Sequence, residues 1–551
     1  MPFDSVLVQK DPEFLANPGL LTIIKKVMTM HSIIRLIYLL PVFILLFSCQ
    51  QRGKREPERP NIILLLTDDQ RDNTLGIMGH PWVKTPNIDL LVNEGIRFSN
   101  TYISEPTCSP SRVAIFIGMH ERKNGIGFTS SYQLTEEQWE ETYPALLRGA
   151  GYYTGFIGKF GVEYYVFRGR AFEKFDFWRG HDGWTKFFPK EFEVESCIPY
   201  HDAREEIITP IMGESINMFL NSLPASKPFC LSVSFNVPHG SQTSSMYTAC
   251  EDWYSMMTPA NENLRLKGHP IYDTLYRKTP FDIPEECALD PYRFIPQTVM
   301  DQNEGRSRTY EYSYNPVSSR EHHIRYYQTI TGLDRVIGEL VKSLEGRGLE
   351  IDRVIIFASD HGLLMGEYGM GGKALLYDLT SKIPCFIIDP AIPDQMRGKT
   401  LDQLVSSLDI TPTILDYAGI VVPERMEGKS LVPLMANKKL PWREEIFLEN
   451  LYTGRDNPFC EGIRRGNWKY IRMYDGKVDY LEEDVDFRDR KLDFEQLFNL
   501  EEDPGEYHNL IDAYEGTAVL ENIRAKCMNY SNDLNRQRVA YKQSSKVQLR
   551  E

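Results

Sequence analysis

The sequence predicts an α/β fold with a mostly parallel sheet, followed by a smaller α+β domain. Short apolar runs of strand length alternate with helical patterns between residues 61 and 388, which is the order of elements in a parallel sheet. Asn61–Thr67 (NIILLLT) is an apolar run, as expected for a strand buried on both faces. The chain has 551 residues, of which 42% are hydrophobic, so it is long enough for more than one globular domain.

The elements of the main domain follow one another in a regular order. Pro86–Glu94 predicts a helix, with Thr85 as its cap and Gly95 as its stop. A strand is expected next, over residues 97–103. The same alternation predicts helices over residues 143–148, 208–223 and 321–344, and strands over residues 152–157, 229–236, 353–358 and 383–388.

The chain is expected to divide near residue 426. Residues 59–426 form the expected main domain, and residues 427–545 form the smaller one, with strands near 445–448 and 468–473 and a helical tail over 513–536. Residues 240–319 show no clear period but are rich in Tyr, Pro, Asn and Asp. Their aromatic content favours an ordered wall of the molecule over a linker.

The N-terminal part has the pattern of an export signal. Residues 36–47 are apolar and follow Arg35, and the run is too short for a membrane span but typical of a signal peptide. Its ending at Ser48-Cys49 resembles a bacterial lipobox, with Cys49 as the lipidated residue; an ordinary signal peptide with an incidental cysteine is the alternative.

We therefore expect an exported bacterial protein, a periplasmic or outer-membrane lipoprotein that meets the membrane only through its lipid anchor. Residues 1–49 would be an upstream extension and signal peptide, and residues 50–58 a linker. Residues 1–27 fit a signal poorly, so translation is expected to start at Met28 or Met30.

Charge and cysteine usage exclude several classes of protein. The formal net charge is −15 and no basic stripe is visible, which argues against a nucleic-acid partner. An anionic substrate stays compatible with this charge, because a few cations in a cleft can outweigh the mean charge locally. The nine cysteines are scattered without a CxxC pair, so the sequence predicts no disulfide scaffold and no zinc finger.

Polar side chains follow four of the expected strands. Asp68-Asp69, Lys159, His239 and Asp360-His361 each stand directly after an apolar run or within a few residues of its end. Any one of them alone is more commonly a helix cap or a loop residue. Because the carboxyl ends of parallel strands meet at one edge of a sheet, together they predict a reactive site there.

The string Cys108-Ser-Pro-Ser-Arg112 resembles the signature of the formylglycine-dependent sulfatases, Cys (or Ser)-x-Pro-Ser-Arg. The family usually has Thr-Gly where this chain has Ile117-Gly118. Further segments resemble the family in the same order: 60–69, 359–362, 407–416 and 497–506. The resemblance covers nearly all of residues 58–511 and implies an alkaline-phosphatase-like α/β/α sandwich with a small C-terminal domain.

The resemblance also implies a nucleophile and a metal. Cys108 would be oxidised to formylglycine by a maturation enzyme; one hydroxyl of its hydrate would attack sulfur, and the other would expel sulfate. One Ca²⁺ would be held by Asp68, Asp69, Cys108, Asp360 and His361. Carboxylates suit Ca²⁺, whereas imidazole suits it less, so His361 is expected to bind the ion weakly or to contact the sulfate as well.

Four further residues have roles implied by the family. Arg112 would hold the oxygens of the hydrate, Lys159 and Lys373 would bind the sulfate, and His239 would protonate the leaving alcohol. Taken singly, each lysine is more commonly a solvated surface residue. The motif around Lys159 departs from the family, because Gly161 stands where a histidine is usual.

The predicted activity is the removal of sulfate from a sulfated oligosaccharide or polysaccharide. A phosphatase or phosphodiesterase of the same superfamily is one alternative, but such enzymes usually carry a Thr or Ser nucleophile and further Asp and His ligands for two zinc ions. A catalytically inactive glycan-binding lipoprotein is the other alternative, and Gly161 is the feature that favours it.

Overall fold

A computed structural model describes residues 59–548 except 129–133, 163–170, 184, 194, 247–268, 281–282, 288, 351, 454–456 and 475–490. The predicted signal peptide and the lipidation site at Cys49 lie outside the described residues. Within the described ranges, no helix combines the length and the apolar character needed to cross a membrane.

The main sheet has eight strands in the order β10-β2-β9-β6-β1-β5-β3-β4. Every neighbouring pair is parallel except the two that involve β9, which runs antiparallel to β2 and β6. The mostly parallel mixed sheet is therefore confirmed. The strands are β1 (Asn61–Thr67), β2 (Ile96–Tyr102), β3 (Tyr153–Lys159), β4 (Phe177–His181), β5 (Phe229–Ser234), β6 (Arg353–Ser359), β9 (Cys385–Ile388) and β10 (Lys399–Ser406).

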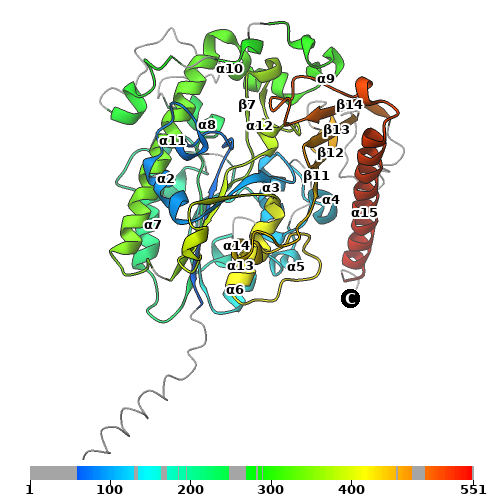
Figure 1. Cartoon of the computed structure of the whole chain (residues 1–551). Coiled ribbons are helices and arrows are strands. Elements are labelled where there is room, and N and C mark those ends of the chain that lie inside the picture. The colour runs from blue at the N-terminus through cyan, green and yellow to red at the C-terminus, as the bar shows by residue number, and fades with distance from the viewer. Residues whose placement is uncertain are drawn as a thin grey trace, which may run out of the picture. The chain divides into compact units, whose positions relative to one another are not determined.

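Helices cover both faces of this sheet, as Figure 1 shows. Successive side chains of β1 alternate between two cores: Ile62 and Leu64 belong to one, and Ile63 and Leu65 to the other. The first core contains α3 (Cys108–Ile117), α6 (Tyr143–Gly149) and α13 (Ile410–Tyr417). The second contains α2 (Pro86–Glu94), α7 (Ile208–Asn221) and α11 (Pro316–Glu345). The three layers confirm the α/β/α sandwich.

The ends of α2 differ in detail from the expectation. The helix has the predicted bounds, but the Thr85 side chain does not cap it. Instead, Thr85 Oγ1 accepts a hydrogen bond from Gly76 N at 2.8 Å and donates one to Asp89 at 2.9 Å. Gly95 ends the helix in an extended conformation; a Cβ there would lie 2.3 Å from Ile387 O, so the close approach of β9 requires the glycine.

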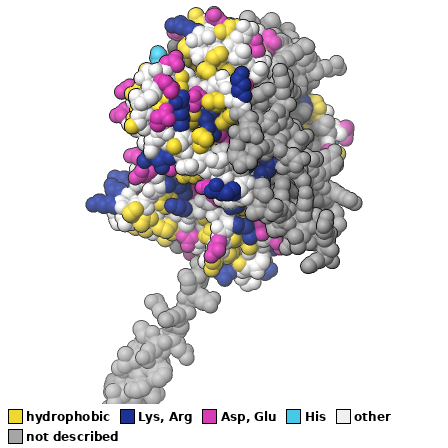
Figure 2. Space-filling model, turned by 90° about the vertical axis from the view of Figure 1, so that its right-hand side faces the viewer, with side chains coloured by type: hydrophobic (Ala, Val, Ile, Leu, Met, Phe, Trp, Pro, Cys, Tyr) yellow, Lys and Arg dark blue, Asp and Glu magenta, His cyan; other side chains and the backbone are white. Residues whose placement is uncertain are grey.

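The C-terminal part forms a second, antiparallel sheet of four strands. Its strands are β11 (Glu445–Asn450), β12 (Phe459–Arg465), β13 (Trp468–Tyr474) and β14 (Leu492–Asn499), and α15 (Ala518–Gln548) packs against it. The smaller α+β domain is thus confirmed in its elements, while its boundary near residue 427 stays a prediction. In the space-filling view of this side (Figure 2), basic and acidic side chains lie among one another over the described surface.

A buried arginine links the two sheets. Arg122 belongs to α4 (Glu121–Asn124), and its Nη2 lies 2.7 Å from both Glu449 Oε2 on β11 and Glu461 Oε1 on β12. All three side chains are almost completely inaccessible to solvent. Arg472 of β13 pairs with Glu461 as well. Because buried charges need such partners, this group fixes the C-terminal sheet to the segment that follows α3.

The described residues of the segment over 240–319 have defined local structure, while its expected role as a wall of the molecule stays a prediction. It consists of short helical turns: α8 (Gly240–Ser244), η8 (Pro270–Thr274), η9 (Glu285–Cys287), η10 (Pro291–Arg293), α9 (Gln297–Asp301), η11 (Glu304–Arg306), η12 (Arg308–Tyr310) and α10 (Glu311–Tyr314). The other short elements are η2 (Gly76–Met78), α5 (Glu136–Trp139), η3 (Ala171–Lys174), η4 (Pro189–Glu191), η5 (Ile198–Tyr200), β7 (Leu364–Met365), η13 (Glu367–Gly369), β8 (Gly371–Gly372), α12 (Asp378–Ser381), η14 (Asp394–Met396), η15 (Ser407–Asp409), α14 (Val432–Ala436) and η18 (Asp512–Tyr514).

Candidate active site

Two pairs of possible metal ligands meet at the carboxyl edge of the main sheet. Asp68 and Asp69 follow β1, while Asp360 and His361 follow β6, and the two strands are parallel neighbours. Asp69 N donates to Asp360 Oδ1 at 3.2 Å. The backbone of Asp69 has a φ of 65°, in the left-handed region that an L-residue rarely adopts. This turn bends the chain at the strand end and keeps both carboxylates at the edge.

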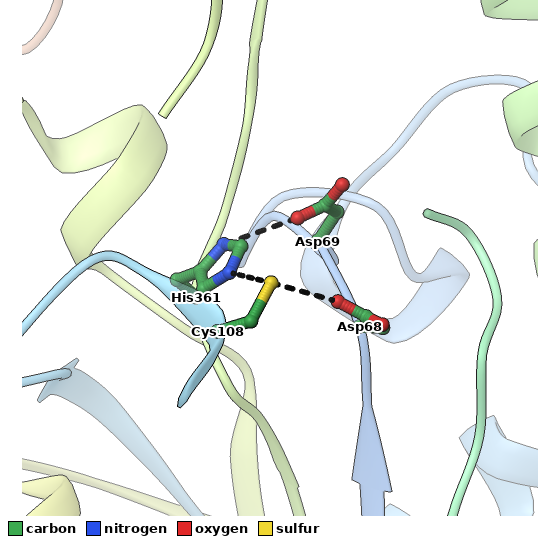
Figure 3. A group of neighbouring side chains, drawn as sticks. All are labelled: Asp68, Asp69, Cys108 and His361. Carbon is green, nitrogen blue, oxygen red and sulfur yellow. Dashed lines mark hydrogen bonds and ion pairs between the residues drawn. The ribbon is translucent and has the colours of Figure 1, made fainter. Parts of the chain in front are cut away.

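Cys108 is the first residue of α3, and its side chain points at these acids (Figure 3). Its Sγ lies 3.7 Å from Asp68 Oδ1 and 3.3 Å from His361 Nε2. The ligand atoms of Asp68, Asp69, Cys108 and His361 all lie within 4.8 Å of one another. Four of the five predicted metal ligands therefore form one buried group.

The fifth predicted ligand, Asp360, lies beside this group and is held by Arg112. Arg112 Nε donates to Asp360 Oδ2 at 2.9 Å, and its Nη2 lies 2.8 Å from the same oxygen. Asp360 Oδ1 is 3.6 Å from His361 Nε2, so this oxygen stays next to the other ligands. Coordination of a metal by Asp360 stays a prediction.

Two lysines reach the group from different strands. Lys159, the last residue of β3, places Nζ 2.6 Å from Asp68 Oδ2. Lys373 follows β8 and places Nζ 2.9 Å from Asp69 Oδ1 and 2.9 Å from Cys108 Sγ. Both side chains are about 95% buried or more. Neither is therefore a solvated surface residue, as most lysines are.

A tight turn brings Lys373 to Cys108. The residues on either side, Gly372 and Ala374, both have left-handed backbones, with φ of 77° and 72°. Ala374 N donates to Pro106 O at 3.1 Å, which ties the turn to the segment before Cys108. A side chain at Gly372 would meet the ring of Tyr310 at 2.7 Å, so this turn depends on the glycine.

Arg112 lies one helical turn after Cys108 and is completely buried behind it. Besides Asp360, its guanidinium donates to Lys159 O at 2.8 Å and to Ser234 Oγ. Gly161, with φ of 67°, makes room for this side chain, because a Cβ at residue 161 would lie 2.6 Å from Arg112 Cδ. The glycine that stands in place of the family's histidine therefore leaves the space that the Arg112 side chain occupies.

His239 is the most solvent-accessible of the predicted catalytic side chains, at 15%. Its Nδ1 accepts a hydrogen bond from Ser241 N at 3.0 Å, so a neutral ring carries its proton on Nε2. This Nε2 lies 3.8 Å from Asp69 Oδ2. The ring thus presents an N–H toward the acidic group, as a proton donor to a leaving group requires.

The charges of the site balance one another. Burial by itself raises the pKa of the Cys108 thiol, but Lys159 and Lys373 hold this pKa well below its usual range. Asp68 likewise has its pKa well below the ordinary value despite burial, chiefly because of Lys159. Burial and the neighbouring Asp68 raise the pKa of Asp360 to about 6. The ionised thiol and the carboxylates are ligands that a metal ion would meet here, whereas the ammonium groups of Lys159 and Lys373 are the donors that an anionic substrate would meet.

Some supporting residues carry no signal in the sequence. Tyr326, in the middle of α11, donates from Oη to Asp69 O at 2.7 Å. Ser359 Oγ accepts from Gln70 N at 3.0 Å and donates to His361 O at 2.8 Å. Ser359 could have been noticed because it precedes the second acidic pair, but nothing in a long amphipathic helix distinguishes Tyr326 from other core residues.

The comparisons with known proteins agree with this geometry. The family described as "Sulfatase" matches residues 60–420, more than half of the chain, and the family described as "N-sulphoglucosamine sulphohydrolase, C-terminal" matches residues 366–533. An arylsulfatase of Clostridium perfringens is 27% identical over 509 residues, which are 85% of this chain and 93% of the relative. An N-acetylglucosamine-6-O-sulfatase of Bacteroides thetaiotaomicron is 27% identical over 513 residues, 86% of either chain.

A solved structure described as a complex with its substrate, D-glucosamine-2-N,6-O-disulfate, has the same fold. Its TM-score is 0.60 at 23% identity, and the match covers 88% of this chain and 99% of that chain. The match to the sulfatase model, on a three-layer sandwich with a buried site of acidic, thiol and cationic groups, defines the protein as a hydrolase. The chain belongs to the sulfatase family and is an enzyme of that family. The predicted family and fold are confirmed.

Proposed function

We propose that this sulfatase removes sulfate from a sulfated carbohydrate, with Cys108, after oxidation to formylglycine, as its nucleophile. One observation carries the proposal: Cys108 Sγ lies 2.9 Å from the ammonium of Lys373 and within the group of metal-ligand atoms. A buried structural cysteine has no need for such neighbours. The surrounding charges favour an ionised nucleophile at this position.

The donor set fits one divalent cation, which we propose to be Ca²⁺. Asp68 and Asp69 offer oxygens, and the sulfur and imidazole atoms of Cys108 and His361 lie within 4.8 Å of them; oxidation of Cys108 would replace its sulfur by oxygen, the donor that Ca²⁺ prefers. Asp360 would supply the remaining carboxylate. When bound, such an ion polarises the sulfate oxygens and lowers the barrier to attack on sulfur.

Lys159 and Lys373 would bind the sulfate. Each ammonium now donates to one of the two acids that follow β1, at 2.6 and 2.9 Å. If those carboxylates coordinate a cation, the lysine donors become available to the oxygens of an anionic ester beside residue 108. Arg112 stays fixed by Asp360, so its part would be to hold the ligands and the hydrate oxygens in place.

His239 would protonate the leaving alcohol. Its Nδ1 is occupied by the backbone of Ser241, so only Nε2, on the side of Asp69, can transfer a proton. Its side chain, 15% exposed, also supports contact with a substrate that enters from solvent.

The substrate class and the cellular location extend this proposal. The relative from Bacteroides is named for sulfate on an N-acetylglucosamine, and the solved structure holds a sulfated glucosamine. We therefore propose a sulfated oligosaccharide or polysaccharide as substrate. A maturation enzyme would oxidise Cys108, and a lipid on Cys49 would hold the protein in a bacterial cell envelope.

Mass spectrometry of the peptide that contains Cys108, together with sulfate release, tests the proposal. The full chain should be made in a host with a formylglycine-generating enzyme and assayed on sulfated glycans and on aryl sulfate and aryl phosphate in parallel. We expect residue 108 to have the mass of formylglycine, and sulfate release to depend on added Ca²⁺. Cys108→Ala should abolish release, while Cys230→Ala, a buried cysteine of β5, should retain it.

An unmodified Cys108 in a protein that releases no sulfate would overturn the proposal. Turnover of phosphate in preference to sulfate would instead support the phosphatase alternative.

A further inference from the structure

A cavity of about 900 Å³ lies where the edge of the main sheet meets the C-terminal sheet and α15. Its walls come from Asn100 on β2, residues 402–404 on β10, residues 443–444 before β11, residues 464–468 around the turn between β12 and β13, and the first turns of α15. A volume of roughly 300–1,000 Å³ is usual for a small-ligand site. None of these lining residues belongs to the active site described above.

Arg464 brings a positive charge without a counter-ion to this cavity. The residue is 6% exposed, and its guanidinium donates to the Tyr102 hydroxyl at 3.0 Å and to two backbone carbonyl oxygens that follow it in the chain. Among the described residues no carboxylate forms an ion pair with Arg464, and Asp378, which Tyr102 contacts, already pairs with Lys469. Arg464 Nη2 has no described acceptor, yet protein atoms do not enclose it. Because a buried charge is costly without a partner, an anion in the cavity would be stabilised here.

The two other arginines that line the cavity already have acidic partners. Arg443 donates to both carboxylate oxygens of Asp409, and Arg465 Nη2 lies 3.1 Å from Glu444 Oε2. The remaining acid of the walls, Asp402, accepts a hydrogen bond from a serine of β2 at 2.7 Å. The positive charge that has no direct acidic partner is therefore that of Arg464.

The start of α15 adds backbone donors to the same cavity. This helix has 31 residues, and its first two, Ala518 and Val519, line the cavity. The first amides of a helix have no acceptor within it, and its N-terminus carries a partial positive charge. The hydroxyl of Thr517 accepts from Leu520 N at 3.4 Å, so it leaves the amides of residues 518 and 519 to other acceptors. Together with Arg464, these amides make a donor set for an anion.

Trp468 gives the cavity an apolar surface. The ring is half-buried and packs edge-on against Tyr514, with 4.9 Å between the ring centroids. An indole offers a flat apolar face with a polar N–H at its edge. A wall of this kind beside an arginine suits an anionic group carried on a compact ring, which is the chemistry of a sulfated sugar residue.

We infer that this cavity is a second binding site for the substrate polysaccharide, in which a sulfate of one sugar residue meets Arg464 and the start of α15 while the sugar ring lies against Trp468. The inference rests on the proposed function for its ligand class and assigns the cavity no part in the reaction itself.

The two sites lie too far apart for a small ester to reach both. Neighbouring strands are about 4.8 Å apart, and β10 stands four positions from β1 in the sheet, so the cavity lies roughly 19 Å to the side of the active site. A polysaccharide can occupy both sites at once, whereas an aryl sulfate cannot. Two linked contacts on one chain would raise the affinity for the polymer without changing the chemical step.

Binding of dextran sulfate to the full-length protein tests the inference, with calorimetry as the readout and uncharged dextran as the comparison. Lys373→Met, which removes an active-site cation, serves as the common background. Val519→Glu places a carboxylate in the cavity and should weaken binding about 10-fold or more. Val519 is 39% exposed and lies in the first turn of α15, where a glutamate stabilises a helix, so the fold should be retained.

Arg464→Gln is the second variant, because it keeps an N–H donor but loses the charge. It should weaken dextran sulfate binding about 10- to 100-fold, the usual effect of removing a hydrogen bond that involves a charged group. Inorganic sulfate should bind the cavity more weakly than the polymer, since the free ion has no ring to contact Trp468. With Lys373 intact, sulfate release from aryl sulfate should change less than about 2-fold in both variants, since distant sites act independently.

Val421→Glu is the matched control. Val421 is 89% exposed and lies outside the cavity, so the same substitution there should change the affinity for dextran sulfate less than about 2-fold. Unchanged affinity in folded Val519→Glu and Arg464→Gln would overturn the inference. Equal binding of dextran and dextran sulfate, or of inorganic sulfate and the polymer, would also overturn it, because the cavity would then not select a sulfated glycan.

The two proposals fail differently. A wild-type protein that releases no sulfate from any ester, yet binds dextran sulfate through this cavity, would refute the proposed function alone. An active sulfatase whose Val519→Glu and Arg464→Gln variants bind dextran sulfate as the unchanged cavity does would refute the present inference alone.

Discussion

Replacing Lys373 by methionine should strengthen metal binding and weaken catalysis at the same time. The ammonium of Lys373 lies 2.9 Å from Asp69 Oδ1 and occupies a carboxylate that the proposed cation needs. With an effective dielectric constant of about 20, two unit charges at this distance attract by about 6 kcal/mol before the cost of burial. The net contribution of such a charged hydrogen bond is about 1.5–3 kcal/mol.

This free energy sets the expected size of both effects. Without the competing ammonium, Lys373→Met should bind Ca²⁺ about 10- to 100-fold more tightly in sulfate-free buffer. Loss of a donor to the sulfate in the transition state should lower kcat/KM by about 100- to 1000-fold, as the removal of a comparable donor does in other hydrolases. Methionine preserves most of the volume of the lysine stem, so packing should change little.

Calorimetric titration with Ca²⁺ and initial rates of sulfate release measure the two quantities. Lys469→Met is the matched control, since Lys469, on β13 of the antiparallel sheet, is equally buried, and its Nζ lies 2.7 Å from Asp378 and 3.0 Å from Glu506. It should lower stability without a change in metal affinity. Weaker Ca²⁺ binding by Lys373→Met, or an unchanged kcat/KM, would refute the reasoning.

Three further substitutions test other parts of the structure. Glu427→Gln removes the anion that, against the effect of burial, raises the pKa of His120 to about 9. The ion pair between protonated His120 and Glu427 stabilises the folded protein fully below about pH 6.5, and this contribution is lost as the pH rises through about 9. Urea unfolding should therefore show a loss of about 2–3 kcal/mol at pH 6 and almost none at pH 10, and equal losses would contradict this. Gly161→His should lower kcat/KM about 10-fold or more, because its Cβ would overlap Arg112 Cδ; sulfate release at or above the wild-type rate would argue otherwise. Arg122→Met should lower the free energy of unfolding by about 3–5 kcal/mol, because buried Glu449 loses its ion-pair partner and Glu461 keeps only Arg472, and a loss under about 1 kcal/mol in chemical denaturation would be inconsistent with that role.

The sequence by itself determined the layers of the fold and indicated which residues to expect at the candidate site. The apolar run Asn61–Thr67 predicts a strand buried on both faces because its side chains alternate between two cores, and the structure shows both. The acids after β1 and β6 could be placed at one edge because the carboxyl ends of parallel strands meet there; that the two strands are direct neighbours came from the structure. The roles expected for Cys108 and Arg112 came from the resemblance to the sulfatase signature, and the structure adds that the two residues lie one helical turn apart on α3.

Tertiary structure alone decided which of these groups touch. Asp360, which follows β6, pairs with Arg112 of α3, and the sequence of neither segment predicts this contact. Gly161 looks like a lost histidine in the sequence, whereas in the fold its place beside Arg112 Cδ requires a residue without a side chain. Asn236 and His181 are 55 residues apart and meet only because β4 and β5 flank β3. Contacts of this kind depend on strand order and on the space between side chains, which the pattern along one chain does not contain.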